Sequence, residues 1–354
     1  MTVGVFDHPW LGGLFDSEGT ADLFSAENQL NYFLEIEASY ALALGEAGAV
    51  PLPVAEEAAR YIRGFRPDED SLNAGSSRDG MVIPDFIRQL KAAADKKLHP
   101  AIHQGLTSQD VIDTALTLTL REANKIMTLN LKGLILLLDE LNKTQGGNRL
   151  MGRTRMQAAK EIRVGHRIEN WLEPLRRQKE NLGRVFQGVE VIQFGGPVGD
   201  RQETAAFAEK IAVSLARRLG LGNPEKSWHT SRGNLTEYAS ALSVLTGSLG
   251  KMGQDFCLMA QQGPDEIQFK GGGSSSAMAH KQNPVNAELL VTLARFNAVQ
   301  VSGMHQAMIH EQERSGTAWT LEWMILPQIV TTTAVALTKA QSAINQITRI
   351  GIQP

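Results

Sequence analysis

Residues 107–143 read TSQDVIDTALTLTLREANKIMTLNLKGLILLLDELNK, and they contain one glycine and no proline. Their apolar side chains return to one broad side at helical spacing. At a rise of about 1.5 Å per residue, a single helix over this stretch exceeds roughly 50 Å. Residues 134–138 are apolar almost all round, so this helix needs cover on more than one side. The stretch predicts the central member of a long helical bundle, with neighbouring subunits as one source of that cover.

Outside this stretch, helical spacing dominates and strand signals are scarce. Aromatic residues make up only 6% of the chain, and strict alternation of apolar and polar residues is rare. We therefore predict an all-α fold. Further long helices are expected over residues 157–189 with a kink at Pro174, 204–219, 235–262, 284–312 and 319–346.

The first hundred residues have a different pattern, because prolines and a glycine-serine loop break them into shorter helices. We expect a domain boundary near residue 101. The predicted organisation is a small N-terminal helical domain (1–100), a long central bundle (101–346) and a short tail (347–354).

Composition restricts the class of protein. The 354 residues carry a formal net charge of −3, which gives no reason to expect nucleic acid or a membrane surface as a partner. Cys257 is the single cysteine, which indicates a reducing compartment, and its apolar neighbours predict a buried, inert thiol. The N-terminus lacks a secretory pattern, and the apolar stretch 131–141 is too short to cross a bilayer. We expect a cytoplasmic protein.

The sequence contains no pattern typical of a cofactor or metal site. It has no glycine-rich loop followed by Lys-Ser or Lys-Thr, and no Gly-any-Gly-any-any-Gly at the start of a strand-helix unit. Its eight histidines do not cluster at the spacing of metal ligands. We predict that no cofactor and no metal is needed.

Residues 269–284, FKGGGSSSAMAHKQNP, form a glycine- and serine-rich stretch between two predicted helices. Composition alone favours a flexible linker before an ordinary capped helix. However, backbone amides in such a loop can turn toward an anion, and Asn283-Pro284 has the pattern of an N-cap followed by proline. Lys281 adds a cation where the helix N-terminus already attracts a carboxylate. A linker and a carboxylate-binding loop both fit these residues.

Two other stretches offer groups that bind carboxylates. In residues 103–115, Thr107 and Asp110 have the spacing of a capping box, and the hydroxyls and free amides of a helix N-terminus also suit an anion. In residues 152–159, Arg155 offers a guanidinium fork, with an exposed surface arginine as the alternative.

The loop SSAMAHKQNP resembles the mobile catalytic loop of the fumarase/aspartase superfamily, whose pattern is two serines, any residue, Met-Pro, any residue, Lys, any residue, Asn-Pro. In that family the first serine is the acid/base on a substrate α-carbon, while the lysine and asparagine hold a substrate carboxylate. The resemblance therefore implies that Ser275, Lys281 and Asn283 are catalytic. The chain departs from the pattern at Ser274, usually glycine, and at Ala279, usually proline.

The other two stretches are similar to two further motifs of that superfamily, and they imply substrate-binding residues. Thr107 and Ser108 match its Thr-Ser-any-Asp motif, and His103 matches an active-site histidine of the adenylosuccinate lyase branch. The stretch GRTRMQ resembles Gly-Arg-Thr-His-any-Gln, which implies binding by Arg155 and Gln157. In lyases the motif histidine supplies or orients a proton for the leaving group. Arginine in its place favours a substrate with an additional carboxylate.

Residues 193–199, 228–232 and 310–323 are similar to the superfamily branch that contains 3-carboxy-cis,cis-muconate cycloisomerases. The branch implies lactonisation of this tricarboxylate to 4-carboxymuconolactone in protocatechuate catabolism, with Arg314 as a further carboxylate ligand. It also implies a homotetramer whose active sites each draw on three subunits. The third domain that many members possess is expected to be largely missing here. The aromatic residues of these stretches are predicted to lie in the core or at an interface.

Two alternatives remain open. One is a lyase of the adenylosuccinate lyase type that cleaves a C–N bond and releases fumarate, against which Arg155 argues. The other is a non-catalytic structural protein built on the same fold, against which Ser275, Lys281 and Asn283 argue.

Overall fold

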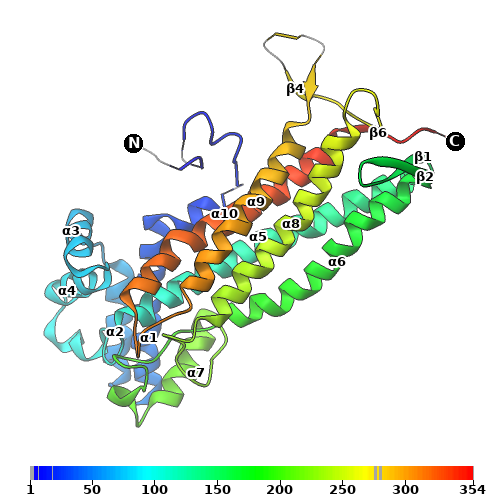
Figure 1. The fold of residues 1–354 in the computed structure, drawn as a ribbon. Coiled ribbons are helices and arrows are strands. Elements are labelled where there is room, and N and C mark those ends of the chain that lie inside the picture. The colour runs from blue at the N-terminus through cyan, green and yellow to red at the C-terminus, as the bar shows by residue number, and fades with distance from the viewer. Residues whose placement is uncertain (1–3, 7, 18, 275–276, 279–280, 354) are drawn as a thin grey trace.

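The computed structural model describes residues 4–6, 8–17, 19–274, 277–278 and 281–353. Within that range, long helices lie side by side in one elongated bundle (Figure 1). α8 packs against α6, α9 and α10, and α5 packs against α6 and α10. The bundle helices are α5 (Ser108–Gln145), α6 (Val164–Val189), α8 (Gly233–Met259), α9 (Val285–Gln306) and α10 (Gly316–Gln346). The all-α prediction is confirmed.

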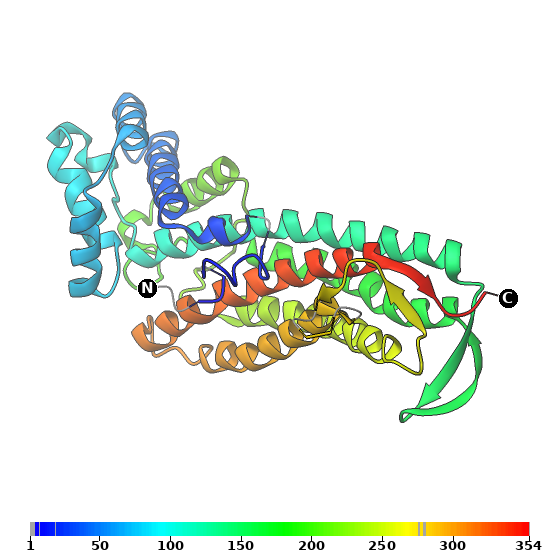
Figure 2. The ribbon, with the colours of Figure 1, turned by 90° about the horizontal axis from the view of Figure 1, so that it is seen from above.

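Shorter helices form a group at one end of the bundle, as Figure 2 shows from above. Their hydrophobic core also takes in the first turns of α5 through Val111, Ile112 and Leu118, whereas α5 from Leu120 onward joins the core of the bundle. The group consists of α1 (Ala26–Ala47), α2 (Leu52–Gly64), α3 (Glu69–Asp79), α4 (Ile83–Ala93), η2 (Lys96–Ala101), η3 (Gln202–Thr204) and α7 (Ala208–Leu219). The short helix η1 (Ala21–Phe24) packs instead against the core of the bundle through Leu23 and Phe24. α7 comes from the middle of the chain and packs on α1. The boundary near residue 101 stays a prediction.

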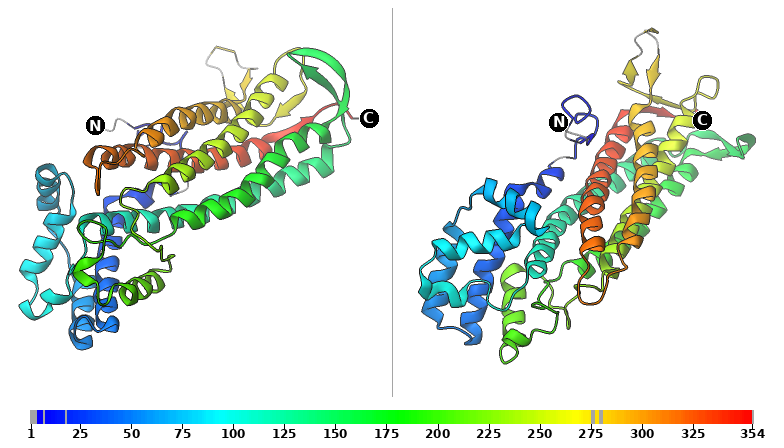
Figure 3. Two further views of the ribbon diagram at one scale, coloured as in Figure 1. Left: turned by 60° about the horizontal axis from the view of Figure 1, so that its bottom comes forward. Right: turned by 60° about the vertical axis from the view of Figure 1, so that its left-hand side comes forward.

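Three two-stranded antiparallel sheets lie at the opposite end of the bundle (Figure 3). The strands are β1 (Arg149–Thr154) with β2 (Gln157–Arg163), β3 (Ile267–Phe269) with β6 (Ile347–Ile350), and β4 (Gly273–Ser274) with β5 (Gln282–Asn283). β3 and β6 connect the end of α8 to the end of α10. The hairpin and the loop before α9 are therefore both held at the same end of the molecule.

The predicted helix over residues 157–189 is wrong at its start, because residues 157–163 form β2 and α6 begins at Val164. Alanine, lysine and glutamate in this stretch favour a helix by propensity, but pairing with β1 overrides that preference. The two-residue turn between the strands is Arg155-Met156, whose φ angles of 47° and 68° are of the kind a type I′ turn requires. Pro174 lies inside α6.

Two further predictions concern Cys257 and membrane spans. Cys257 is half-buried rather than buried as predicted, and burial raises the pKa of its thiol to about 11, which agrees with an inert cysteine. α10, rather than residues 131–141, is the described helix that is long and apolar enough to cross a membrane. Because 67% of its apolar window is buried, α10 has the character of a core helix.

α8 and α9 approach each other closely where α8 carries glycines. A Cβ atom at Gly253 would lie 2.6 Å from the backbone oxygen of Ala287 and 2.8 Å from Cβ of Leu290. One at Gly250 would lie 2.5 Å from Cβ of Ala294. The two backbones therefore meet over these glycines, and a larger side chain would push the helices apart.

We expect Gly253→Ala to destabilise the fold by about 1–3 kcal/mol, because overpacking at this contact outweighs the gain in helix propensity. Gly247→Ala is the matched control on α8, since a Cβ at Gly247 meets nothing within 4 Å. This control should stabilise the protein by up to about 1 kcal/mol. Urea denaturation compares the two variants, and equal effects would contradict the close approach.

Candidate active site

Four of the predicted binding residues come together at the start of α5. Thr107 is the N-cap and Ser108 the first residue of this helix, and His103 lies just before them. Arg314 reaches the same turn, because its Nε donates to Oε1 of Gln109 at 3.1 Å. We call the region formed by these residues the α5 corner: His103, Thr107, Ser108, Gln109 and Arg314.

Arg155, Gln157, Lys281 and Asn283 lie at the opposite end of the bundle. The 38 residues of α5 separate the two ends by about 57 Å. Asn283 and Arg155 also line different cavities. One chain therefore does not bring all the predicted residues into a single site.

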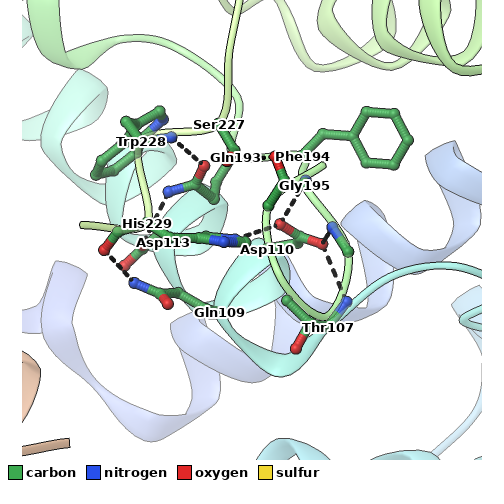
Figure 4. Close-up of polar contacts among 12 residues, drawn as sticks. Thr107, Gln109, Asp110, Asp113, Gln193, Phe194, Gly195, Ser227, Trp228 and His229 are labelled. Carbon is green, nitrogen blue, oxygen red and sulfur yellow. Dashed lines mark hydrogen bonds and ion pairs between the residues drawn. The ribbon is translucent and has the colours of Figure 1, made fainter. Parts of the chain in front are cut away.

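Asp110 fixes the geometry of the α5 corner, as Figure 4 shows. Its buried carboxylate accepts hydrogen bonds from the backbone amides of Thr107 (3.0 Å), Gly195 (2.9 Å) and Gly196 (2.9 Å). It also lies 2.8 Å from Nε2 of His229. The Asp110 half of the predicted capping box is thus present, and the same carboxylate ties the loop after α6 and the loop before α8 to α5.

The glycine pair in the loop after α6 allows this close approach. A Cβ at Gly195 would lie 2.8 Å from Cε1 of His229, and Gly196 has a φ of 74° that side chains rarely adopt. Gly195 and Gly196, in the stretch 193–199 that resembles the cycloisomerase branch, are therefore required by the packing of the α5 corner.

A buried ion-pair network lies one turn further along α5. Arg232, just before α8, donates to Asp113 at 2.6 Å and to Glu322 of α10 at 2.9 Å, and all three side chains are 0–1% exposed. Burial alone lowers the pKa of Arg232, but Asp113 and Glu322 outweigh it and hold that pKa above its ordinary value. The Arg232 guanidinium also lies 4.6 Å from the ring centroid of Trp228.

Two tryptophans of the stretches 228–232 and 310–323 contact this network or its arginine. Trp319 donates from Nε1 to Asp113 at 3.1 Å, and Trp228 donates from Nε1 to the carbonyl of Ile192 at 3.0 Å. Both indoles are buried, which agrees with the prediction that the aromatic residues of these stretches lie in the core or at an interface. We did not predict Asp113 or Glu322 from the sequence, because their partner Arg232 is 119 and 90 residues away.

His103 is held in an unusual conformation at the edge of the α5 corner. Its φ is 56°, and its Nδ1 lies 2.6 Å from the carboxylate of Glu37, which is fully buried. The Tyr40 hydroxyl donates to the carbonyl of Gln104 at 2.7 Å, and burial raises the pKa of Tyr40 well above its usual range. These contacts hold His103 at a positive φ, a backbone conformation that residues with a side chain rarely adopt.

Arg155 occupies the exposed tip of the β1–β2 hairpin. Its φ is positive, a conformation that is costly for any residue other than glycine. It lines a cavity of about 420 Å³ together with Arg153, Arg167 and Lys251. Arg153 is paired with Glu266 at 2.9 Å, and Lys251 is paired with Asp255. Gln157, the first residue of β2, is exposed and is not among the residues that line this cavity.

The loop before α9 is closed at its base by pairing of Gly273 with Asn283 and of Ser274 with Gln282. Asn283 is half-buried and Lys281 is exposed. Ser275 lies outside the described residues. The predicted helix start is wrong by one residue, because Pro284 is the N-cap of α9 and Asn283 belongs to β5.

Comparison with known proteins identifies the protein family of this chain. A family model described as lyase matches residues 24–303. The chain belongs to this lyase family, which is part of the fumarase/aspartase superfamily.

Individual members of the family and solved structures are also similar to this chain. The chain is 32% identical to 3-carboxy-cis,cis-muconate cycloisomerase of Acinetobacter baylyi over 92% of this chain and 74% of that protein. It is 27% identical to N-acetyl-S-(2-succino)cysteine lyase of Dickeya dadantii over 93% of this chain and 73% of that protein. The solved structure of the 3-carboxy-cis,cis-muconate lactonizing enzyme from Pseudomonas putida matches with a TM-score of 0.87 and 31% identity, covering 97% and 77% of the two chains.

We expect Asp110→Asn to lower the free energy of unfolding by about 3 kcal/mol, because an amide group would face donors that the carboxylate now satisfies. Asp139→Asn is the control on the same helix, since Asp139 forms only a partly exposed pair with Arg176. Its effect should stay within about 1 kcal/mol. Similar losses in the two variants, measured by urea denaturation, would contradict the anchoring role of Asp110.

Proposed function

We propose that the protein is a cycloisomerase that converts 3-carboxy-cis,cis-muconate to 4-carboxymuconolactone in protocatechuate catabolism. The observation that carries the proposal is Arg155, which lines a cationic cavity at the position where the superfamily motif has histidine. Lactone closure expels no group, and the carboxylate that leaves in the reverse reaction is already stable as an anion. A guanidinium that binds carboxylate suits this chemistry better than a proton donor. Relatives named as this cycloisomerase, at 32% and 33% identity, support the assignment.

The proposed mechanism has two steps. A carboxylate oxygen of the substrate forms a C–O bond to the conjugated double bond, and the displaced electron pair moves into an aci-carboxylate. Lys281, Asn283 and the amides of the loop stabilise this charge. The Ser275 hydroxyl then protonates the α-carbon, and the serine regains its proton from solvent. No atom is lost, so the product is an isomer of the substrate.

We further propose a homotetramer in which each active site combines residues of three subunits. The support is the length of α5, because residues at its two ends lie about 57 Å apart and cannot touch one small substrate within a chain. A second subunit antiparallel to the first would bring a hairpin or a loop beside each α5 corner. The single cysteine suits a cytoplasmic location.

A C–N or C–S lyase that releases fumarate is the competing function, and the relative named N-acetyl-S-(2-succino)cysteine lyase supports it. The same loop chemistry would serve both reactions, because each passes through an aci-carboxylate. Incubation with adenylosuccinate and with N-acetyl-S-(2-succino)cysteine distinguishes them, since fumarate forms only if the protein is a lyase of this kind.

The direct test follows the ultraviolet absorbance of the conjugated diene of 3-carboxy-cis,cis-muconate. The wild-type protein should consume it, and Ser275→Ala should reduce kcat at least about a hundredfold, because a positioned proton donor contributes on this scale. Lys281→Met should also reduce kcat. The proposal fails if wild-type protein leaves the diene intact or if Ser275→Ala is fully active.

Arg155→Ala should raise KM for 3-carboxy-cis,cis-muconate about tenfold to a hundredfold, the loss expected for one charge-assisted contact. The effect on cis,cis-muconate, measured as substrate or as inhibitor, should be much smaller because it lacks the third carboxylate. Lys160→Ala on the same hairpin is the control, since Lys160 does not line the cavity. Equal effects of Arg155→Ala on both muconates would exclude a role in binding the third carboxylate.

A further inference from the structure

Arg314 is presented to the α5 corner by two contacts. It precedes Ser315, the N-cap of α10, and is half-buried. Its Nε donates to Oε1 of Gln109 at 3.1 Å, and one terminal nitrogen donates to the carbonyl of Pro197 at 3.0 Å. Both partners are neutral, so neither of them offsets the positive charge of the guanidinium. The N-terminal turns of α5 and α10 lie beside it, and both favour an anion.

The orientation of the Gln109 carboxamide follows from its partners. Gln109 is 0% exposed, and its Nε2 donates to the carbonyl of His229 at 2.9 Å. That carbonyl can only accept, so the amide nitrogen must face His229 and the amide oxygen must face Arg314. The buried carboxamide has little freedom to move, because its nitrogen and its oxygen are both hydrogen-bonded.

Gln109 also links Arg314 to the groups that shape the helix start. His229, whose carbonyl holds Gln109, is itself bonded to Asp110 at 2.8 Å, and Asp110 accepts from the Thr107 amide at 3.0 Å. Arg314 and the Thr107-Ser108 pair are therefore fixed to one buried frame. Gln109 occupies the position that the Thr-Ser-any-Asp motif leaves open.

We propose that Gln109 is a positioning residue, which orients the Arg314 guanidinium toward a substrate carboxylate held at Thr107 and Ser108. The proposal rests on the proposed function. A neutral acceptor is required, because a glutamate at position 109 would neutralise Arg314 and compete with the substrate. It would also face the His229 carbonyl without a proton to donate. A leucine would leave both neighbours without a partner.

The test compares Gln109→Leu, Gln109→Glu, Arg314→Ala and the double variant Gln109→Leu/Arg314→Ala. We expect each variant at Gln109 to raise KM about tenfold or more, with a smaller change in kcat. In the Arg314→Ala background, Gln109→Leu should add almost nothing, since there is no guanidinium left to orient. A purely structural role would instead give the same change in both backgrounds, and this result would overturn the proposal.

Gln341→Leu is the matched control. Gln341 of α10 also donates to a carbonyl of α5, that of Asn130 at 2.9 Å, but far from the α5 corner. It should leave KM unchanged while costing a similar amount of stability. If Gln109→Leu does not fold, the nearly isosteric Gln109→Glu carries the comparison.

A binding measurement separates this inference from the proposed function. Calorimetry with tricarballylate, an unreactive tricarboxylate, should show about tenfold weaker binding for Gln109→Leu than for wild-type protein, with no further loss in the double variant. Failure of wild-type protein to consume the muconate rejects the reaction but not this coupling. Undiminished tricarballylate binding by Gln109→Leu, or none by wild-type protein, overturns the positioning role.

Discussion

The buried ion pairs of Arg232 with Asp113 and Glu322 are the constraint on which the rest of the structure depends. They join the starts of three bundle helices, α5, α8 and α10, at one point that solvent does not reach. Taking three charges out of water is expensive, and the arrangement is tolerable only because hydrogen bonds from Trp319 and Gln193 complete the shell of Asp113. Removal of Arg232 would leave two carboxylates buried without a counter-charge, so this arginine holds the three helix starts in one relative position.

This fixed point also determines the geometry of the α5 corner. Asp110 lies one turn before Asp113, so the network that orients α5 also sets the loops that Asp110 binds. The opposite end of the bundle is organised separately, by strands β3 and β6 and by the pairing of Arg153 with Glu266. A helix of 38 residues keeps the two ends apart, so residues at opposite ends of one chain cannot contact the same small molecule. Assembly of several subunits is the proposed way to bring such residues together.

The sequence predicted those features whose signal is local. The helix expected over residues 107–143 is observed as Ser108–Gln145, because its apolar spacing is continuous and the Asp110 cap is local. β2 was missed because its residues favour a helix, and only pairing with a strand eight residues earlier makes it extended. The ion pairs of Arg232 were missed for a different reason, since their partners are separated by about a quarter to a third of the chain. A single sequence does not reveal such pairings. The stretches 228–232 and 310–323, which contain Arg232 and Glu322, were identified only by their resemblance to the cycloisomerase branch.

The departure from the family pattern at Ser274 also has a structural explanation. Ser274 lies in β4 and pairs with Gln282, so its backbone is extended, a conformation that any residue adopts without strain. Gly273 is the position with no room, because a Cβ there would lie 2.5 Å from Val285 at the start of α9. A serine in place of the usual glycine at 274 is therefore compatible with a closed loop base. The close contact of Gly273 with Val285 instead holds β4 against the start of α9, and the pairing of Gly273 with Asn283 fixes β5 beside it.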